Sequence, residues 1–153
     1  ARETLFNWLQ PWLRGAKCAD LFAGTAVLGL EAASRGAADV ILVELNRSAA
    51  RSIRESLEML RADNCRLIES DALAWLRSCE PASLDIVFVD PPFDQQLESV
   101  VLKQIRERGC LVSGGLAYVE TARDAPRVAA GEGWETVREK VLGDVRIQLL
   151  KKI

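Results

Sequence analysis

Histidine is absent from this chain of 153 residues, and its absence excludes several kinds of catalytic site. Ser-His-Asp triads, Cys-His pairs and histidine-based zinc sites all require an imidazole ring. Acid or base chemistry must therefore fall to carboxylates, lysines, the single tyrosine Tyr118 or backbone groups. We expect no metal centre.

The chain also has few cysteines, no long apolar run and no excess of positive charge. The four cysteines, at positions 18, 65, 79 and 110, form no CxxC pair, which predicts unpaired thiols in a cytoplasmic protein. No apolar run approaches the roughly 20 residues that span a bilayer, and no signal peptide pattern is present, so we expect no membrane association. Twenty basic residues against 22 acidic ones give a net charge of −2, which does not by itself indicate nucleic acid.

Short apolar runs and helical periodicities alternate along the chain. Apolar, strand-like runs cover Cys18–Phe22, Val40–Val43, Arg66–Glu69, Leu84–Val89 and Leu116–Glu120. Helical patterns cover Glu3–Leu13, Val27–Ser34, Asn46–Leu60, a short segment holding Leu73 and Leu76, and Leu97–Glu107. We expect Asn46 to cap its helix, and Pro11 to kink or end the first helix, whose apolar stripe includes Trp12.

Uniformly apolar strands that alternate with helices indicate a parallel sheet buried on both faces. The last two segments, Glu135–Val141 and Val145–Leu150, alternate in polarity around Gly143-Asp144, which predicts an antiparallel hairpin. No repeat or linker interrupts the pattern, and the longest irregular segment is Thr121–Gly133. The sequence therefore predicts one doubly wound α/β domain over residues 1–153, with a mostly parallel sheet.

Four carboxylates follow four of the expected strands: Asp20, Glu44, Asp71 and Asp90. Ligands of doubly wound sheets bind outside the carboxyl ends of the strands, where the strand order reverses. Gly24 permits a tight turn close to a ligand, and Gly29 lets the following helix pack near the sheet.

A ligand that carries a phosphate fits these residues poorly. Leu30-Glu31 stands where a P-loop has Lys-Ser, and Phe22 replaces the first glycine of a dinucleotide fingerprint. A ligand with adenine, ribose and a positive group fits better, and S-adenosylmethionine is such a ligand. Asp20 could face its amino-acid portion, Glu44 its ribose and Asp71 its adenine amine.

The stretch Asp90-Pro91-Pro92-Phe93 matches the [DNS]-P-P-[YF] signature of methyltransferases that modify planar exocyclic nitrogens. The lone pair of such an amine is delocalised, so the amine is a poor nucleophile that must be held in place. The Asp90 carboxylate and the Pro91 carbonyl can accept its two N–H bonds, while Pro91 and Pro92 fix the carbonyl direction. Phe93 offers a ring on which an extruded base can stack. The Pro-Cys nucleophile of carbon-5 cytosine methyltransferases is missing.

Longer stretches extend the likeness over essentially the whole chain. RETLFNWL, DLFAGTAVLGLEAASRGA, VELNR, DPPF, Tyr118-Val119-Glu120 and the closing hairpin resemble the bacterial small-subunit (16S) ribosomal RNA guanine-N2 methyltransferases of the RsmD type. The resemblance implies a seven-stranded, Rossmann-like class I methyltransferase that acts on 16S ribosomal RNA of the small subunit with S-adenosylmethionine. We expect a monomer. It implies cofactor contacts at Asp20, Phe22, Ala23, Gly24, Thr25, Gly29, Glu44, Leu45, Asp71 and Ala72, and target-amine contacts at Asp90, Pro91, Pro92 and Phe93.

In one respect the sequence departs from that family, whose members carry a basic extension before RETLFNWL. This chain begins inside the motif, without methionine, so we expect a missing segment that supplies RNA contacts. Arg47, Arg51 and Arg54 share a helical stripe with acidic neighbours and are interpreted as a solvated face. Two alternatives stay open: an amino methyltransferase acting on DNA adenine, DNA cytosine or protein glutamine, and a cofactor-binding scaffold without activity.

Overall fold

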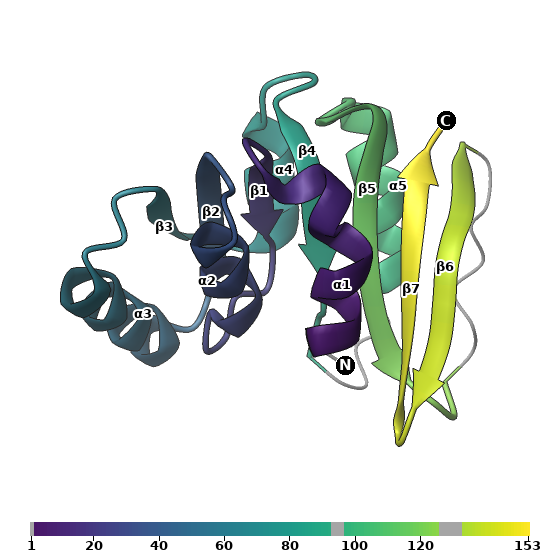
Figure 1. The fold of residues 1–153 in the computed structure, drawn as a ribbon. Helices are drawn as coiled ribbons and strands as arrows, with labels where there is room; N and C mark the ends of the chain where they lie inside the picture. Colours follow the sequence, from purple (N-terminus) through teal and green to yellow (C-terminus); the bar gives the residue numbers. More distant parts are fainter. Residues whose placement is uncertain (1, 93–96, 126–132) are drawn as a thin grey trace.

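The computed structural model describes residues 2–92, 97–125 and 133–153. One seven-stranded sheet has the order β3-β2-β1-β4-β5-β7-β6 (Figure 1). Its strands are β1 (Lys17–Asp20), β2 (Asp39–Glu44), β3 (Cys65–Glu69), β4 (Leu84–Val89), β5 (Leu111–Ala122), β6 (Trp134–Leu142) and β7 (Val145–Lys152). The helices are α1 (Arg2–Leu13), α2 (Val27–Ser34), α3 (Arg47–Leu60), α4 (Ala72–Ser78) and α5 (Glu98–Arg108).

The first five strands pair in parallel, and β7 pairs antiparallel with both β5 and β6. Leu142 lies opposite Val145, so Gly143 and Asp144 form the two-residue turn of the predicted hairpin. The order runs outward from β1 in two directions, and it reverses between β1 and β4. The predicted doubly wound fold with an antiparallel hairpin is confirmed.

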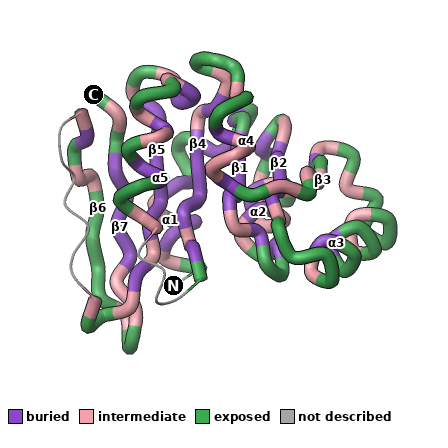
Figure 2. Tube along the Cα trace, turned by 180° about the vertical axis from the view of Figure 1, so that it is seen from behind, coloured by how far each residue is buried: buried purple, intermediate pink, exposed green. Residues whose placement is uncertain are grey.

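Helices cover both faces of the sheet and bury two apolar clusters. α1, α2 and α3 lie on one face, and α4 and α5 lie on the other (Figure 1). The first cluster joins Leu5, Phe6 and Leu9 of α1 to residues of the central strands, and the second holds Leu76 of α4 and Ile105 of α5. Burial continues through the central strands and fades at α3 and β6 (Figure 2). This two-sided burial is why the central strands are apolar throughout.

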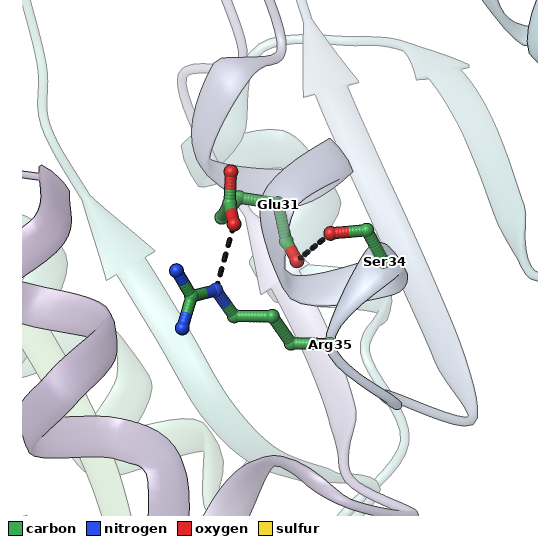
Figure 3. A network of polar contacts seen from close by, with 3 residues as sticks. All are labelled: Glu31, Ser34 and Arg35. Carbon is green, nitrogen blue, oxygen red and sulfur yellow. Dashed lines mark hydrogen bonds and ion pairs between the residues drawn. The ribbon is translucent and has the colours of Figure 1, made fainter.

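A short polar network joins α2 to α1. The Arg35 guanidinium forms an i,i+4 ion pair with Glu31 at 2.7 Å, while the Ser34 hydroxyl donates to the Glu31 carbonyl at 2.8 Å (Figure 3). The same guanidinium lies 5.3 Å from the centre of the Phe6 ring. A cation held over an aromatic face contributes about 0.5–1 kcal/mol at a surface site. The contact holds the end of α2 beside α1 on the same face of the sheet.

Several sequence predictions about the elements were wrong in detail. Pro11 lies inside α1 and does not end it, since the helix continues to Leu13, as its predicted bounds Glu3–Leu13 require. Trp12 is 46% exposed and does not belong to the buried stripe. The first strand ends at Asp20 rather than Phe22, since the chain turns there into a loop. β5 begins at Leu111, five residues before its predicted start.

The two ends of the described chain lie at opposite ends of the parallel strands (Figure 1). α1 runs back toward the start of β1, so its first turn lies beside the carboxyl ends of β4 and β5 (Figure 1). β7 runs antiparallel to β5 and brings Lys151 opposite Leu116, near the amino ends of the parallel strands. No helix within the described ranges is long and apolar enough to cross a membrane.

Candidate functional site

A cavity of about 740 Å³ opens where the strand order reverses. Its walls come from the segments that follow β1, β2, β3 and β4, as the strand-end argument predicts. The predicted residues that line it are Phe22, Ala23, Gly24, Thr25, Glu44, Leu45, Asp71, Ala72, Asp90, Pro91 and Pro92. Asp20 and Gly29 are not among the lining residues, and Phe93 lies outside the described residues.

Glu44 ties together two loops of the cavity. One of its carboxylate oxygens accepts the Gly24 N–H at 2.7 Å, and the other accepts the Asn46 N–H at 2.8 Å. The loop after β1 is thus fastened to the loop after β2 before any ligand arrives. Each carboxylate oxygen can accept a further hydrogen bond, so the two backbone bonds leave Glu44 able to receive ligand hydroxyls.

Asp20 lies beneath the cavity rather than in its wall. It is only 2% exposed, and one carboxylate oxygen accepts the Gly29 N–H at 3.2 Å. The other oxygen, Oδ1, is buried without a hydrogen-bond partner. Burial raises the pKa of this carboxyl from 3.8 to about 7, against the lowering effect of the Gly29 hydrogen bond and of the nearby Phe22 N–H. Asp20 therefore positions the loop from below and does not directly face the ligand space.

Gly29 lets α2 approach the sheet closely. A Cβ atom at this position would lie 2.2 Å from a methyl carbon of Leu42 and 3.3 Å from one of Val40. The loop ahead of α2 is tightly bent, with positive φ at Gly24 (58°) and at Ala26 (64°). A left-handed alanine is strained, and such strain concentrates at functional sites.

Two helices begin at the cavity with side-chain caps. Asn46 accepts the Ala49 N–H at 2.9 Å, which confirms the predicted cap of α3. Asp71 accepts the Ala74 N–H at 3.2 Å and so caps α4 while it also lines the cavity. Leu45 stands 70% exposed at the same cavity, as an apolar surface for a flat ring.

A second carboxylate and a tyrosine lie next to Asp90. Glu120, near the end of β5, accepts a 2.6 Å hydrogen bond from the buried Tyr118 hydroxyl. Burial first, and then the charges of Glu120, Asp20 and Glu98, raise the pKa of Asp90 to about 7. Burial and the bond to Glu120 raise the pKa of Tyr118 above its ordinary value. The sequence analysis did not assign Glu120 to the site, although the strand-end rule that selected Asp90 applies to it as well.

The lining is acidic and apolar, and it contains no lysine or arginine among the residues that the structure describes. A phosphate would find no fixed positive charge there, whereas a cationic ligand with ribose hydroxyls would find acceptors. The described residues hold no group of three or more cysteines, aspartates or glutamates that could bind a metal ion.

A family profile described as Conserved hypothetical protein 95 matches residues 1–151. The chain belongs to this family. Ribosomal RNA small subunit methyltransferase D of Escherichia coli (strain K12) is 38% identical over 151 residues, which cover 99% of this chain and 76% of that protein. Its counterpart in Haemophilus influenzae is 35% identical over 151 residues, covering 97% and 78%.

The solved structure of yhhF from Escherichia coli superimposes with a TM-score of 0.89 at 39% identity, and covers 99% of this chain and 85% of that one. These matches confirm the resemblance to the RsmD type. They also confirm that the chain has a class I methyltransferase fold.

Proposed function

We propose that this protein transfers a methyl group from S-adenosylmethionine to the exocyclic N2 amine of a guanine in the 16S RNA of the small ribosomal subunit. The observation that carries the proposal is the convergence of Glu44, Asp71 and Asp90 on one cavity at the switch point of the sheet. The names of the relatives support ribosomal RNA as the substrate class. Free thiols at all four cysteines suit work in the cytoplasm.

S-adenosylmethionine would supply a methyl group made electrophilic by its sulfonium. Glu44, already fixed by Gly24 and Asn46, would accept the ribose hydroxyls. Leu45 would pack on the adenine ring, and Asp71 would accept from the adenine amine with the lone pairs that its cap does not use. Acidic walls without basic residues match the net positive charge of this cofactor.

Asp90 and the Pro91 carbonyl would hold the target amine through its two N–H bonds. Pro91 is buried and Pro92 is exposed, so the first proline is fixed within the protein while the second borders solvent. Their role is orientation: the nitrogen lone pair is kept in line with the methyl group, and Asp90 can take the proton that the amine releases. Phe93 would stack on the base.

The proposal is tested by methyl transfer from labelled cofactor to small ribosomal subunits, naked ribosomal RNA and DNA, together with calorimetry for S-adenosylmethionine and NAD. We expect transfer to a guanine of the small-subunit RNA and binding of S-adenosylmethionine only. Asp90→Asn should retain more activity than Asp90→Ala, because the amide oxygen still accepts one N–H. Transfer to DNA alone, or tight NAD binding, would refute the proposal.

A further inference from the structure

Asp90 directly follows β4 and Glu120 lies near the end of the neighbouring parallel strand β5, level with it and on the same face of the sheet. The register pairs Phe88 with Tyr118 and Val89 with Val119, so the next positions along each strand are Asp90 and Glu120. Side chains two residues apart share a face, and the Phe88 and Tyr118 rings meet edge-on with centroids 6.3 Å apart. The two carboxylates therefore follow a pair of contacting rings and lie beside each other.

Glu120 is held in place by the core rather than by solvent. The hydroxyl that donates to its Oε1 atom belongs to Tyr118, whose side chain is fully buried among residues of α1 and the central strands. Half-buried Glu120 can accept further hydrogen bonds, since a carboxylate has about four lone-pair sites. A carboxylate held in one orientation, with lone pairs still able to accept hydrogen bonds, recognises a base edge better than a mobile surface carboxylate does.

The two carboxylates lie at the boundary of the cofactor cavity. Asp90 lines the cavity, whereas Glu120 does not and stands on the β5 side of Asp90. A base whose amine reaches Asp90 from outside the cavity would have its neighbouring edge atoms close to Glu120.

The identity of those edge atoms separates the possible substrates. In guanine the 2-amine lies between N1–H, a donor, and N3, an acceptor, so on its Watson–Crick side the amine and its neighbour are both donors. In adenine and cytosine the amine adjoins a ring nitrogen that accepts, and in a glutamine side chain it adjoins a carbonyl oxygen. A second carboxylate beside the first favours the donor–donor edge and repels the donor–acceptor edges.

We propose that Glu120 is a specificity-determining residue that accepts the N1–H of guanine while Asp90 accepts from the 2-amine. The inference rests on the proposed function, because it takes a base amine at Asp90 as its starting point. Tyr118 acts as the positioning residue that aligns the Glu120 carboxylate through their hydrogen bond.

The test measures binding of guanosine and of 2-aminopurine riboside by NMR, with S-adenosylhomocysteine present. The two nucleosides share the 2-amine, but N1 of 2-aminopurine is an acceptor. We expect the unmodified protein to prefer guanosine by about tenfold or more, the discrimination of one good base-edge contact. Glu120→Gln should remove most of that preference, because the amide can accept from the N1–H of guanosine and can equally donate to N1 of 2-aminopurine. Glu98→Gln, which deletes another charge felt by Asp90, should keep the preference.

An unchanged ratio in Glu120→Gln, or no preference in the unmodified protein, would overturn the inference. Thermal midpoints of both variants close to that of the unmodified protein show that a changed ratio does not come from misfolding. Failure of the proposed function has a separate signature, namely absence of methyl transfer to any guanine of the RNA. A reduced preference of Glu120→Gln for guanosine over 2-aminopurine riboside, with unchanged affinity for S-adenosylhomocysteine, would establish that Glu120 recognises the base.

Discussion

At the scale of single residues, Asp20 is a buried carboxyl group that holds the loop after β1 through its hydrogen bond with Gly29. Its pKa of about 7 means that the folded chain binds a proton there which the unfolded chain, with an ordinary value of 3.8, releases. The contribution of protonated Asp20 to the free energy of unfolding is fully present below pH 3.8 and is lost as the pH rises through about 7. The protein therefore carries an unfavourable buried charge in alkaline solution.

Asp20→Asn should raise the free energy of unfolding at pH 8 by about 1–3 kcal/mol, because a neutral amide needs no desolvation of charge. At pH 4 the two proteins should be nearly equal in stability. Urea denaturation at both pH values checks this. A variant that is less stable at pH 8 would mean that hydrogen bonding to the carboxylate outweighs the cost of burying its charge.

Asp90 has a comparably raised pKa, but in its case the group faces the cavity. If the ionised carboxylate holds the amine, kcat/KM for methyl transfer should rise with pH and level off above about 7. Asp90→Asn cannot titrate and should show a flat profile at a lower rate. Asp20→Asn serves as the control and should keep the inflection, moved slightly toward acid because one nearby charge is gone. An inflection that persists in Asp90→Asn would assign it to another group.

At the scale of elements, the packing of α2 depends on the missing side chain at Gly29. In Gly29→Ala the new methyl would overlap fully buried Leu42 and press on Val40, so α2 must shift outward. We expect a loss of about 1–3 kcal/mol in stability and weaker cofactor binding, because the bent loop moves with the helix. Ser34→Ala, on the exposed side of the same helix, should change stability by less than about 0.5 kcal/mol. Chemical denaturation and calorimetry of both variants decide the matter, and equal behaviour would contradict this packing argument.

The sequence predicted most of the elements because local rules govern them. The Asn46 cap and the Gly143-Asp144 turn depend on a few adjacent residues, and the apolar runs report burial on both faces. Trp12 was misjudged because the exposure of a helix face is decided by its neighbours in space. β5 was predicted too short because Ser113, Gly114 and Gly115 interrupt its apolar pattern, while pairing with β4 resumes after a register shift.

For the site, the strand-end rule predicted which residues reach the cavity but not how deep each one lies. Nothing in the sequence distinguishes Asp20, which is buried under the loop, from Glu44, which borders the ligand space. Glu120 was overlooked although it ends the predicted strand Leu116–Glu120, and only the register between β4 and β5 shows that it lies level with Asp90. The roles of the lining residues toward the cofactor and the RNA stay predictions.

At the scale of the whole molecule, nearly balanced charge leaves little to attract an RNA backbone. Arg51 and Arg54 of the α3 stripe are each paired with a carboxylate, at 3.8 Å to Glu55 and 2.6 Å to Glu69. These exposed ion pairs contribute little to stability, but they reduce the positive potential of the stripe. Their pairing agrees with its interpretation as a solvated face.

A basic segment added ahead of Arg2 would emerge beside the carboxyl ends of β4 and β5 (Figure 1). We expect this fusion to raise RNA affinity, to steepen its dependence on salt and to accelerate methyl transfer. The same segment fused after Ile153, at the opposite end of the parallel strands, should raise affinity without a comparable gain in rate. Binding and transfer across a salt series compare the two fusions. Equal acceleration by both would mean that net charge matters and its position does not.

The double attachment of Glu44 restricts how this protein can evolve. In many nucleotide-binding folds the acidic residue after the second strand can be exchanged to accommodate a different ribose substituent. Here the same carboxylate fastens the first loop to the second through Gly24 and Asn46. A basic residue at this position would release both loops at the moment that it altered ligand preference. Ligand preference and loop geometry therefore cannot be varied independently at this position.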